Sequence, residues 1–400
     1  MKTPSELAAK DIAAHLHPFT NLATHADVGP LVITRGDGIH VIDEQGRRYI
    51  EGMSGLWCSS LGFSHPRLVA AGTQALQTLP YYHTFNHRSN PAVAQLAEKL
   101  LALAPVPMAR VFFANSGSEA NDSAVKMVWY YHNAIGKPAK KKILARQRAY
   151  HGVTVAAASL SGLPANHQDF DLPIDRISHV ECPHHYRYGL PGESEADFAT
   201  RLADSLEQRI LQEGPDTVAA FFAEPVMGAG GVIVPPETYF EKVQAVLRKY
   251  QVLLVADEVI CGFGRTGNMF GSTTFGLQPD ILTCAKALSS GYVPISAVMV
   301  SPAIHDALAA NSGRIGTFGH GYTYSGHPVA SAIALETLKV YEDDHILERV
   351  RELAPGFQAR LRQFGQRRCV GEARGVGLIG ALELVADKAS RQPFAPALKA

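Results

Sequence analysis

Two side chains that could act on one small molecule stand at the ends of two apolar runs. Asp257 follows the run Val252–Ala256, and Lys286 comes shortly after the run Ile281–Cys284. Runs of this length and composition are typical of buried parallel strands, whose carboxyl ends form the edge where open α/β sheets bind ligands. A carboxylate there could pair with a pyridine nitrogen, and an amine could attack an aldehyde. We therefore expect Asp257 and Lys286 to meet in one site.

The neighbours of both residues support this hypothesis. Lys286 lies among small neutral residues, and partial desolvation there would lower the pKa of its ammonium group and free the amine for Schiff-base and proton-transfer chemistry. On a continuing strand, Asp257 and Val259 would face the same side, so that one meets a ring nitrogen while the other packs on the ring. A solvated surface lysine and an aspartate that only caps the following turn are the alternative interpretations.

A turn of small residues could bind an anion. The apolar run 111–114 leads into Ser116, Gly117 and Ser118, and a helical pattern follows. Backbone N–H groups and hydroxyls at such a strand-to-helix turn can surround a phosphate, and the helix dipole favours its negative charge. An ordinary serine N-cap is the alternative interpretation.

An aromatic residue is available at another strand end. Tyr150 and His151 follow the apolar run 143–145 across a short loop. The ring of Tyr150 could stack on a conjugated ligand, although a tyrosine more often packs in a core.

Several other functions lack a supporting motif. Two stretches fit G-x-G-x-x-G, at 262–267 and 375–380, but the first continues into a glycine-rich loop and the second into a strand pattern. A dinucleotide site needs a helix at that point and an acid about 20 residues later. The chain has no nucleophile elbow, no H-E-x-x-H and no phosphate-loop motif, so hydrolase and NTPase functions have no support either.

The histidine-rich stretches do not suggest a metal centre. Three groups of histidines stand out: His15 with His17, His83 to His87, and His184 with His185. Apart from Cys182, no carboxylate or cysteine stands beside them at the spacing of metal ligands. We therefore expect no bound metal.

The composition is that of a globular cytoplasmic protein. The 400 residues are 46% hydrophobic and carry 37 basic and 37 acidic side chains, so the formal net charge is zero and a nucleic-acid role has little support. Five scattered cysteines without a C-x-x-C spacing suit a reducing compartment. The N-terminus lacks the apolar segment of a signal peptide, and no stretch is long and apolar enough to suggest a membrane span.

The order of apolar runs indicates the elements that would position these residues. From residue 111, short strand-like runs alternate with longer helical patterns, which predicts a doubly wound α/β domain with a mainly parallel sheet. Before it, period-2 runs at 31–34 and 39–43 predict a small antiparallel meander. The last part, 345–400, combines a charged amphipathic helix with strand-like, glycine-rich segments.

Two helix signals flank the repeated pattern. Asn90 followed by Pro91 predicts the start of one helix, and Pro328 predicts the start of another that leaves the large domain. We divide the chain into an N-terminal segment of a small domain, a large ligand-binding domain and a C-terminal part of the small domain, at 1–58, 59–330 and 331–400.

At these residues the chain resembles the fold-type I pyridoxal-phosphate enzymes, and more closely the class III aminotransferases, in particular the ω-amino acid or amine:pyruvate transaminases. The matching motifs run in family order through almost the whole chain, at 17–21, 55–58, 79–85, 115–122, 150–152, 224–231, 257–267, 285–288 and 321–328. The resemblance implies a large doubly wound domain beside a smaller α+β domain built from both termini. It also implies a homodimer that uses pyridoxal 5'-phosphate.

The resemblance carries roles for individual residues. Lys286 would form the Schiff base with the cofactor and shuttle a proton, and Asp257 would pair with the pyridine nitrogen. Thr323 would reach the phosphate bound by the partner subunit. The resemblance also implies that Ser116, Gly117 and Ser118 contact the phosphate of the cofactor. Tyr150 and Val259 would pack on the two faces of its ring, and His151 and Glu224 would lie close to it.

The same resemblance implies a substrate class. Aromatic residues would line the substrate pocket, which suits an apolar amine or a flexible ω-amino acid; they are Phe19, Trp57, Phe85 and Tyr150. In the implied ping-pong reaction, an amino donor loses its amino group to the cofactor, and a keto acid, pyruvate, then takes it up.

The sequence departs from the family pattern at its C-terminus. Family members usually continue for several dozen residues, which complete the small domain and supply an arginine for the substrate carboxylate. That arginine has no counterpart among residues 1–400, so we expect an incomplete small domain with exposed apolar surface and reduced stability. Two other functions stay open: another fold-type I reaction, such as that of a mutase, racemase or decarboxylase, and an inactive truncated relative that binds the cofactor or assembles with a partner.

Overall fold

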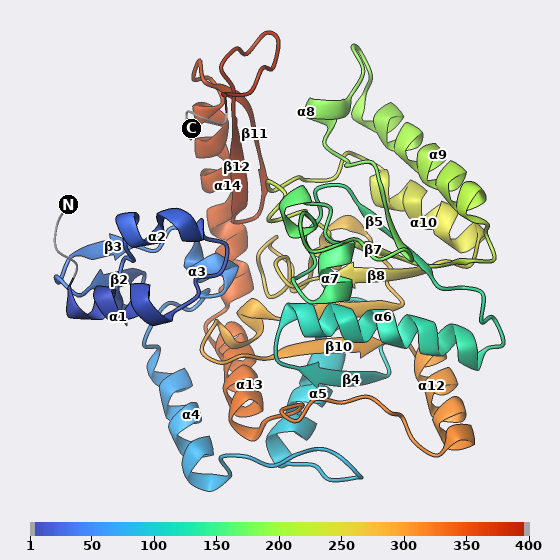
Figure 1. Ribbon diagram of the computed structural model, residues 1–400, viewed down its shortest axis with the longest axis horizontal. Helices are drawn as coiled ribbons and strands as arrows, with labels where there is room; N and C mark the ends of the chain where they lie inside the picture. Colours follow the sequence, from blue (N-terminus) through green and yellow to red (C-terminus); the bar gives the residue numbers. More distant parts are fainter. Residues whose placement is uncertain (1–4, 396–400) are drawn as a thin grey trace.

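The computed structural model describes residues 5–395, and a seven-stranded sheet forms its centre (Figure 1). In order along the sheet, the strands are β4 (Arg110–Ala114), β10 (Ser296–Val300), β9 (Ile281–Cys284), β8 (Leu253–Asp257), β7 (Val218–Ala223), β5 (Lys142–Arg146) and β6 (Ile177–Val180). Neighbouring strands are parallel except at β10, which runs antiparallel to both β4 and β9. The predicted, mainly parallel sheet is confirmed.

Helices cover both faces of this sheet because its strands are apolar on both sides. Along β7, Phe221 packs into one helical layer and Phe222 into the other. Both rings are fully buried, and each contributes about 1.5–3 kcal/mol by leaving water. One layer holds α6 (Gly117–Ala134), α7 (Val155–Leu160) and α12 (Pro302–Ile315), and the other holds α5 (Pro91–Leu103), α9 (Glu195–Glu213), α10 (Tyr239–Lys249) and α13 (Pro328–Asp343).

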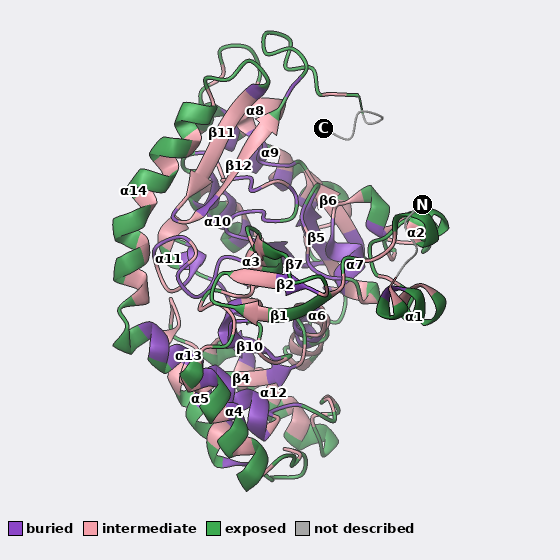
Figure 2. Ribbon diagram, turned by 90° about the vertical axis from the view of Figure 1, so that its left-hand side faces the viewer, coloured by how far each residue is buried: buried purple, intermediate pink, exposed green. Residues whose placement is uncertain are grey.

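Both predicted helix starts are confirmed, but the second helix does not leave the large domain. Asn90 Oδ1 accepts the backbone N–H of Val93 at 3.0 Å at the start of α5. Helix α13 packs against α5 and α4 (Pro66–Thr78), and its Leu338 joins the cluster that contains Leu282 of the sheet (Figure 2). Residue 330, at which the predicted domain boundary lies, falls inside α13, and the domain division itself stays a prediction.

The terminal regions form smaller units beside the large sheet (Figure 1). The predicted meander is confirmed as an antiparallel sheet, and the N-terminal elements are α1 (Glu6–Ala14), α2 (Leu22–Val28), β1 (Ile33–Asp37), β2 (His40–Asp43), β3 (Arg48–Ile50) and α3 (Ser54–Trp57). The C-terminal elements are α14 (Ile346–Phe364) and a hairpin of β11 (Val370–Val376) and β12 (Ile379–Leu384). One cavity is lined by Ile39 from the first region and by Ile346 and Leu378 from the second, so the two regions adjoin.

Four short helical turns complete the fold: η1 (Pro164–Asn166), α8 (His185–Tyr188), α11 (Gly271–Phe275) and η2 (Lys286–Ser289). The glycine-rich stretch 262–267 forms turns and not the helix that a dinucleotide-binding site needs. This agrees with the loop expected from the sequence. Among residues 5–395, no helix combines the length and the apolar character needed to cross a bilayer.

Candidate active site

The carboxyl edge of the sheet brings together residues that lie far apart in the sequence. Parallel strands end at the same edge, so the loops after β4, β5, β7, β8 and β9 converge there. They surround a cavity of about 360 Å³. Among its lining residues are most of the predicted cofactor contacts, namely Ser116, Gly117, Ser118, Tyr150, His151, Glu224, Asp257, Val259 and Lys286.

The carboxylate of Asp257 is held by three hydrogen bonds. Its Oδ2 accepts from Asn121 Nδ2 and from His151 Nδ1, both at 2.8 Å, and its Oδ1 accepts from the backbone N–H of Val259 at 3.0 Å. Since an ionised carboxylate only accepts, His151 must carry its proton on Nδ1. These contacts fix the orientation of the carboxylate and leave Oδ1 able to accept one further hydrogen bond at the edge of the cavity.

Two residues of this network had no role in the sequence analysis. Thr283 Oγ1 donates to Asn121 Oδ1 at 2.9 Å, which turns the amide nitrogen of Asn121 toward Asp257 and toward the carbonyl oxygen of His151. Asn121 lies between Ala120 and Asp122 in a helix, and no spacing rule connects it with a threonine on β9. Only the fold brings the two side chains together.

Replacing Asn121 with alanine is expected to lower the free energy of unfolding by about 1–3 kcal/mol, because Asp257 and His151 would each lose a buried donor. Urea denaturation followed by circular dichroism measures this change. Asn133→Ala, on an exposed position of the same helix, is the matched control and should shift stability by less than about 0.5 kcal/mol. Equal losses in the two variants would contradict the role given to Asn121.

Lys286 stands at the first position of η2 with a left-handed φ of 48°. This backbone conformation costs a non-glycine residue roughly 1–2 kcal/mol, and such strain is common where a side chain must be held toward a ligand. Burial of the ammonium group lowers the pKa of Lys286, and the negative charge of Asp257 partly offsets this effect. The direction agrees with the sequence-based expectation and favours the free amine.

The small-residue turn after β4 forms the cap of helix α6. Ser116 Oγ accepts the N–H of Glu119 at 3.2 Å, so the ordinary N-cap interpretation holds for Ser116. Gly117 and Ser118 are the first residues of α6, where backbone N–H groups have no partner within the helix. A Cβ atom on Gly117 would lie 3.1 Å from both methyl groups of Val259, so glycine lets these two loops approach each other closely.

Glu224 connects the loops that follow β5 and β7. Its Oε1 accepts the N–H of Tyr150 at 3.0 Å, and its Oε2 accepts the N–H of Gly228 at 2.9 Å. Burial raises the pKa of Glu224. Both oxygens hold backbone N–H groups, and because Tyr150 lines the cavity, Glu224 is a positioning residue for Tyr150.

Val259 lines the cavity, but it arrives there differently from the expectation. The prediction of a strand that continues through Val259 is wrong, because β8 ends at Asp257 and a turn follows. The hydrogen bond from Val259 N–H to Asp257 Oδ1 closes this turn. The turn, in place of the alternation of a continuing strand, brings the valine side chain to the cavity wall.

Four predicted residues are absent from the wall of this cavity within one chain. Phe19 is 78% exposed and Phe85 is 43% exposed, and Phe85 lines a second cavity with His320. Thr323 is exposed, with its carbonyl oxygen accepting from Tyr81 Oη at 3.1 Å. Trp57 is partly buried beside Arg265, and its neighbour Cys58 reaches the cavity instead.

Curated proteins with similar sequences are transaminases. The family model described as Aminotransferase class-III matches residues 22–400. Gamma aminobutyrate transaminase 1, mitochondrial, of Solanum lycopersicum is 54% identical over 382 residues, which are 95% of this chain and 74% of that protein. The corresponding protein of Oryza sativa subsp. japonica is 54% identical over 380 residues, with the same two coverages.

Solved structures agree with the sequence comparison. The crystal structure of the omega transaminase from Pseudomonas jessenii in complex with PMP has a TM-score of 0.97 and 57% identity, covering 98% of this chain and 86% of that chain. A transaminase from directed evolution by ancestral reconstruction has a TM-score of 0.97 and 47% identity, covering 98% and 87%. The chain belongs to the class III aminotransferase family and shares the fold-type I architecture of these transaminases.

Proposed function

We propose that this aminotransferase moves an amino group from an ω-amino acid or amine to a keto acid, pyruvate, with pyridoxal 5'-phosphate bound at the sheet edge. The observation that carries the proposal is that Asp257, Lys286 and the small-residue turn 116–118 line one cavity. The names of the relatives, gamma-aminobutyrate and omega transaminases, support the amino-donor class.

The residues present fit this cofactor. Gly117 and Ser118 offer backbone N–H groups for a phosphate, Asp257 offers a free acceptor position for a protonated ring nitrogen, and Lys286 offers an amine of lowered pKa for the aldehyde. When bound, the cofactor would supply an aldehyde that exchanges amines and a ring that accepts an electron pair. Tyr150 and Val259 would flank that ring.

Each residue then has a chemical task. The charge of Asp257 would favour the protonated form of a pyridine nitrogen beside it, because an opposite charge favours the charged form. Asn121 and His151 hold that carboxylate in place. The free amine of Lys286 would take the proton that leaves the donor carbon, hold it and pass it on, as a general base of lowered pKa can do.

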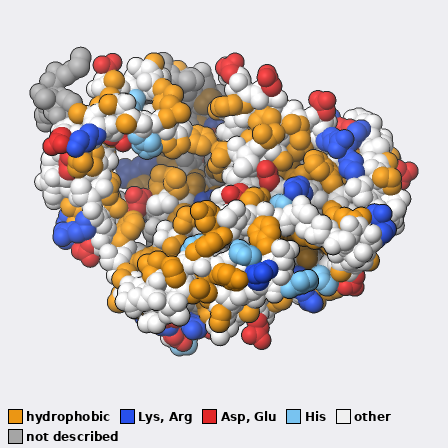
Figure 3. All heavy atoms as spheres, turned by 60° about the horizontal axis from the view of Figure 1, so that its bottom comes forward, with side chains coloured by type: hydrophobic (Ala, Val, Ile, Leu, Met, Phe, Trp, Pro, Cys, Tyr) orange, Lys and Arg blue, Asp and Glu red, His pale blue; other side chains and the backbone are white. Residues whose placement is uncertain are grey.

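We also propose a homodimer in which Thr323 completes the phosphate site of the partner subunit. The face shown in Figure 3 carries many hydrophobic side chains between scattered charges. Exposed aromatic residues lie on the segments before α5 and before α13, namely Tyr81, Tyr82, Phe85 and Tyr324. Soluble monomers rarely expose large apolar patches, and a subunit interface would bury these side chains. Phe19, Trp57 and Phe85 would reach a substrate pocket in the dimer.

A mixed dimer tests the position of Thr323. Thr323→Ala alone should weaken cofactor binding by about 10- to 100-fold, because a hydrogen bond to a charged group is lost. Co-expressed Thr323→Ala and Lys286→Ala subunits should regain one working site per dimer, since the first supplies the lysine and the second the threonine. At a cofactor concentration too low to load the Thr323→Ala parent, mixed dimers without activity above both parent variants would contradict the proposed cross-subunit contact.

Borohydride reduction followed by peptide mapping tests the cofactor assignment. Reduction of the cofactor-loaded protein should attach the cofactor covalently to the peptide that contains Lys286. Absence of the cofactor from that peptide would contradict the proposal. A panel of β-alanine, 4-aminobutyrate, diamines and aromatic amines, each with pyruvate or 2-oxoglutarate, then identifies the substrates. Product formation without any keto acid would favour a mutase, racemase or decarboxylase instead.

A further inference from the structure

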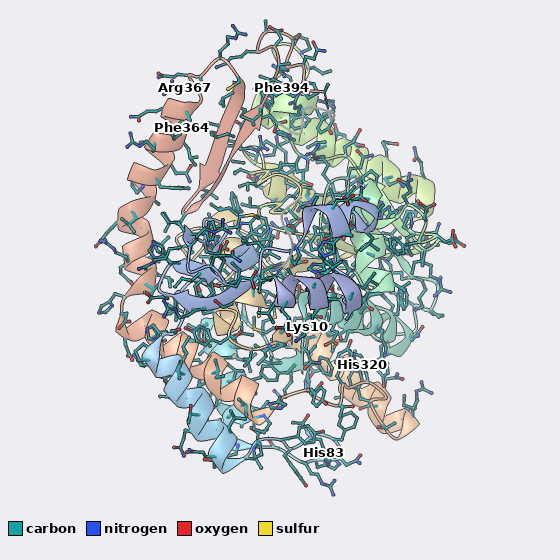
Figure 4. The ribbon with its side chains drawn as sticks, turned by 60° about the vertical axis from the view of Figure 1, so that its left-hand side comes forward. Lys10, His83, His320, Phe364, Arg367 and Phe394 are labelled. Carbon is teal, nitrogen blue, oxygen red and sulfur yellow. The ribbon has the colours of Figure 1, made fainter. Side chains whose placement is uncertain are left out.

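Three histidines gather around one aspartate at the N-terminal end of the protein, outside the cavity described above. Asp11 lies in α1, His15 caps that helix, His17 follows it, and His25 lies in the last turn of α2. Figure 4 labels Lys10, the neighbour of Asp11, on α1. The expectation that no carboxylate stands at ligand spacing beside His15 and His17 is wrong, because Asp11 precedes His15 by one helical turn.

Three ligand atoms of this cluster lie close enough together to be brought around one metal ion, once the short hydrogen bond between Asp11 and His17 widens. Asp11 Oδ1 lies 3.2 Å from His15 Nδ1, and Asp11 Oδ2 lies 2.5 Å from His17 Nε2 and 3.6 Å from His25 Nε2. Ligands that are about 2.0–2.1 Å from a tetrahedral zinc ion lie roughly 3.3 Å from one another. The ligand atoms of Asp11, His15 and His17 are all within 4.8 Å of each other, so small side-chain rotations would suffice to enclose an ion.

Hydrogen bonding within the protein does not account for the whole cluster. His25 Nε2 is buried and has no hydrogen-bond partner among the described residues, although it points at the carboxylate of Asp11. Imidazole nitrogens and one carboxylate are a donor set that suits divalent zinc, copper and nickel.

A second group of similar composition differs in its charge. His184, Glu372 and Glu383 also lie close together, but Arg374 Nη1 donates to both carboxylates, at 2.7 and 2.8 Å. Arg187 donates to Glu383 as well. Because these guanidinium groups already neutralise the carboxylates, a cation would be attracted only weakly to this group. The described neighbours of Asp11 include no comparable arginine contact.

We propose that Asp11, His15 and His17 form a binding site for a divalent transition-metal ion such as zinc, with His25 turning its unpartnered Nε2 to the ion as a fourth ligand. An ion held by these four side chains joins α1 to α2 and fixes the connecting segment. That segment carries Phe19, which has a left-handed φ of 49°. The site is separate from the cofactor cavity, so metal binding does not depend on the proposed reaction.

Titration of the chelator-treated 400-residue chain with Zn²⁺ in a calorimeter tests the proposal. One ion per chain should bind, and Co²⁺ in its place should give the intense visible bands of a tetrahedral complex. Asp11→Asn, His15→Gln and His25→Gln should each weaken binding by at least about tenfold. The control is His305→Gln, because His305 Nδ1 also lies 3.2 Å from a carboxylate, that of Asp306, but without other histidines.

Each other outcome counts against the site. No heat of binding with the unaltered chain would overturn it, as would a Co²⁺ spectrum of a six-coordinate complex. Equal affinities for the unaltered chain and the Asp11→Asn and His15→Gln variants would overturn it too, provided that circular dichroism shows both variants folded. Loss of binding in Glu372→Gln with Glu383→Gln, but not in the N-terminal variants, would assign the ion to the other cluster.

Discussion

Lys286→Ala is expected to lower the rate of amino transfer by at least about 10⁴-fold, because the variant loses both the amine that attacks the aldehyde and the group that moves the proton. The fold should persist, since the lysine occupies the wall of a cavity and its ammonium group is destabilised by burial there. The cofactor should bind without covalent attachment. Initial rates with a saturating donor and pyruvate, together with borohydride trapping, measure both effects.

A lysine elsewhere on the sheet provides the control for this variant. Lys142, in β5, is partly buried and lies 2.8 Å from Glu213 Oε2, away from the cavity. Lys142→Ala should change stability slightly and leave the rate of amino transfer within about twofold of the unaltered enzyme, because surface ion pairs are worth about 0–1 kcal/mol. Near-normal activity of Lys286→Ala would refute the assignment of the site.

Asp257→Asn is expected to lower kcat by about 10²–10³-fold, the cost of removing one preorganised electrostatic group from an active site. The amide could keep an oxygen toward Asn121 and His151, but its nitrogen would then face the N–H of Val259 and the ring nitrogen of the cofactor. The ring nitrogen would lose its proton because the negative charge is gone. Steady-state kinetics at a saturating concentration of cofactor separate this effect from weaker binding.

The control for Asp257 is a carboxylate at the opposite edge of the same sheet. Asp280 precedes β9 and its Oδ2 accepts the N–H of Leu254 at 2.8 Å. Asp280→Asn keeps that acceptor and should leave kcat nearly unchanged. Asp257→Glu keeps the charge and should retain more activity than Asp257→Asn. Equal kcat values for Asp257→Asn and the unaltered enzyme would exclude a charged partner for the ring nitrogen.

Local sequence pattern was sufficient to predict much of the large domain. Asp257 and Lys286 follow directly on Val- and Leu-rich runs, so their place at the carboxyl edge depends only on recognising two buried strands. The helix start at Asn90 and Pro91 was equally accessible, because both its cap and its proline are local signals. The identity of the cofactor was inferred from the family resemblance and not from the local sequence pattern.

What the sequence did not reveal depends on contacts between distant segments. The antiparallel direction of Ser296–Val300 is set by its pairing with β4 and β9, and a strand buried on both faces has no pattern that encodes direction. The amide of Asn121 is oriented by Thr283, which lies in another element. The contact of His25 with Asp11 likewise needs the turn of the chain between α1 and α2.

A single half-reaction tests the central claim, that this site transfers amino groups, most directly. The enzyme loaded with pyridoxal 5'-phosphate is mixed with an amino donor such as 4-aminobutyrate in the absence of any keto acid. The proposed function predicts a loss of the cofactor's visible absorbance, one equivalent of carbonyl product per site and no further turnover until pyruvate is added, which restores the absorbance and yields alanine. Continued turnover without pyruvate, or an unchanged absorbance with every donor, would contradict it.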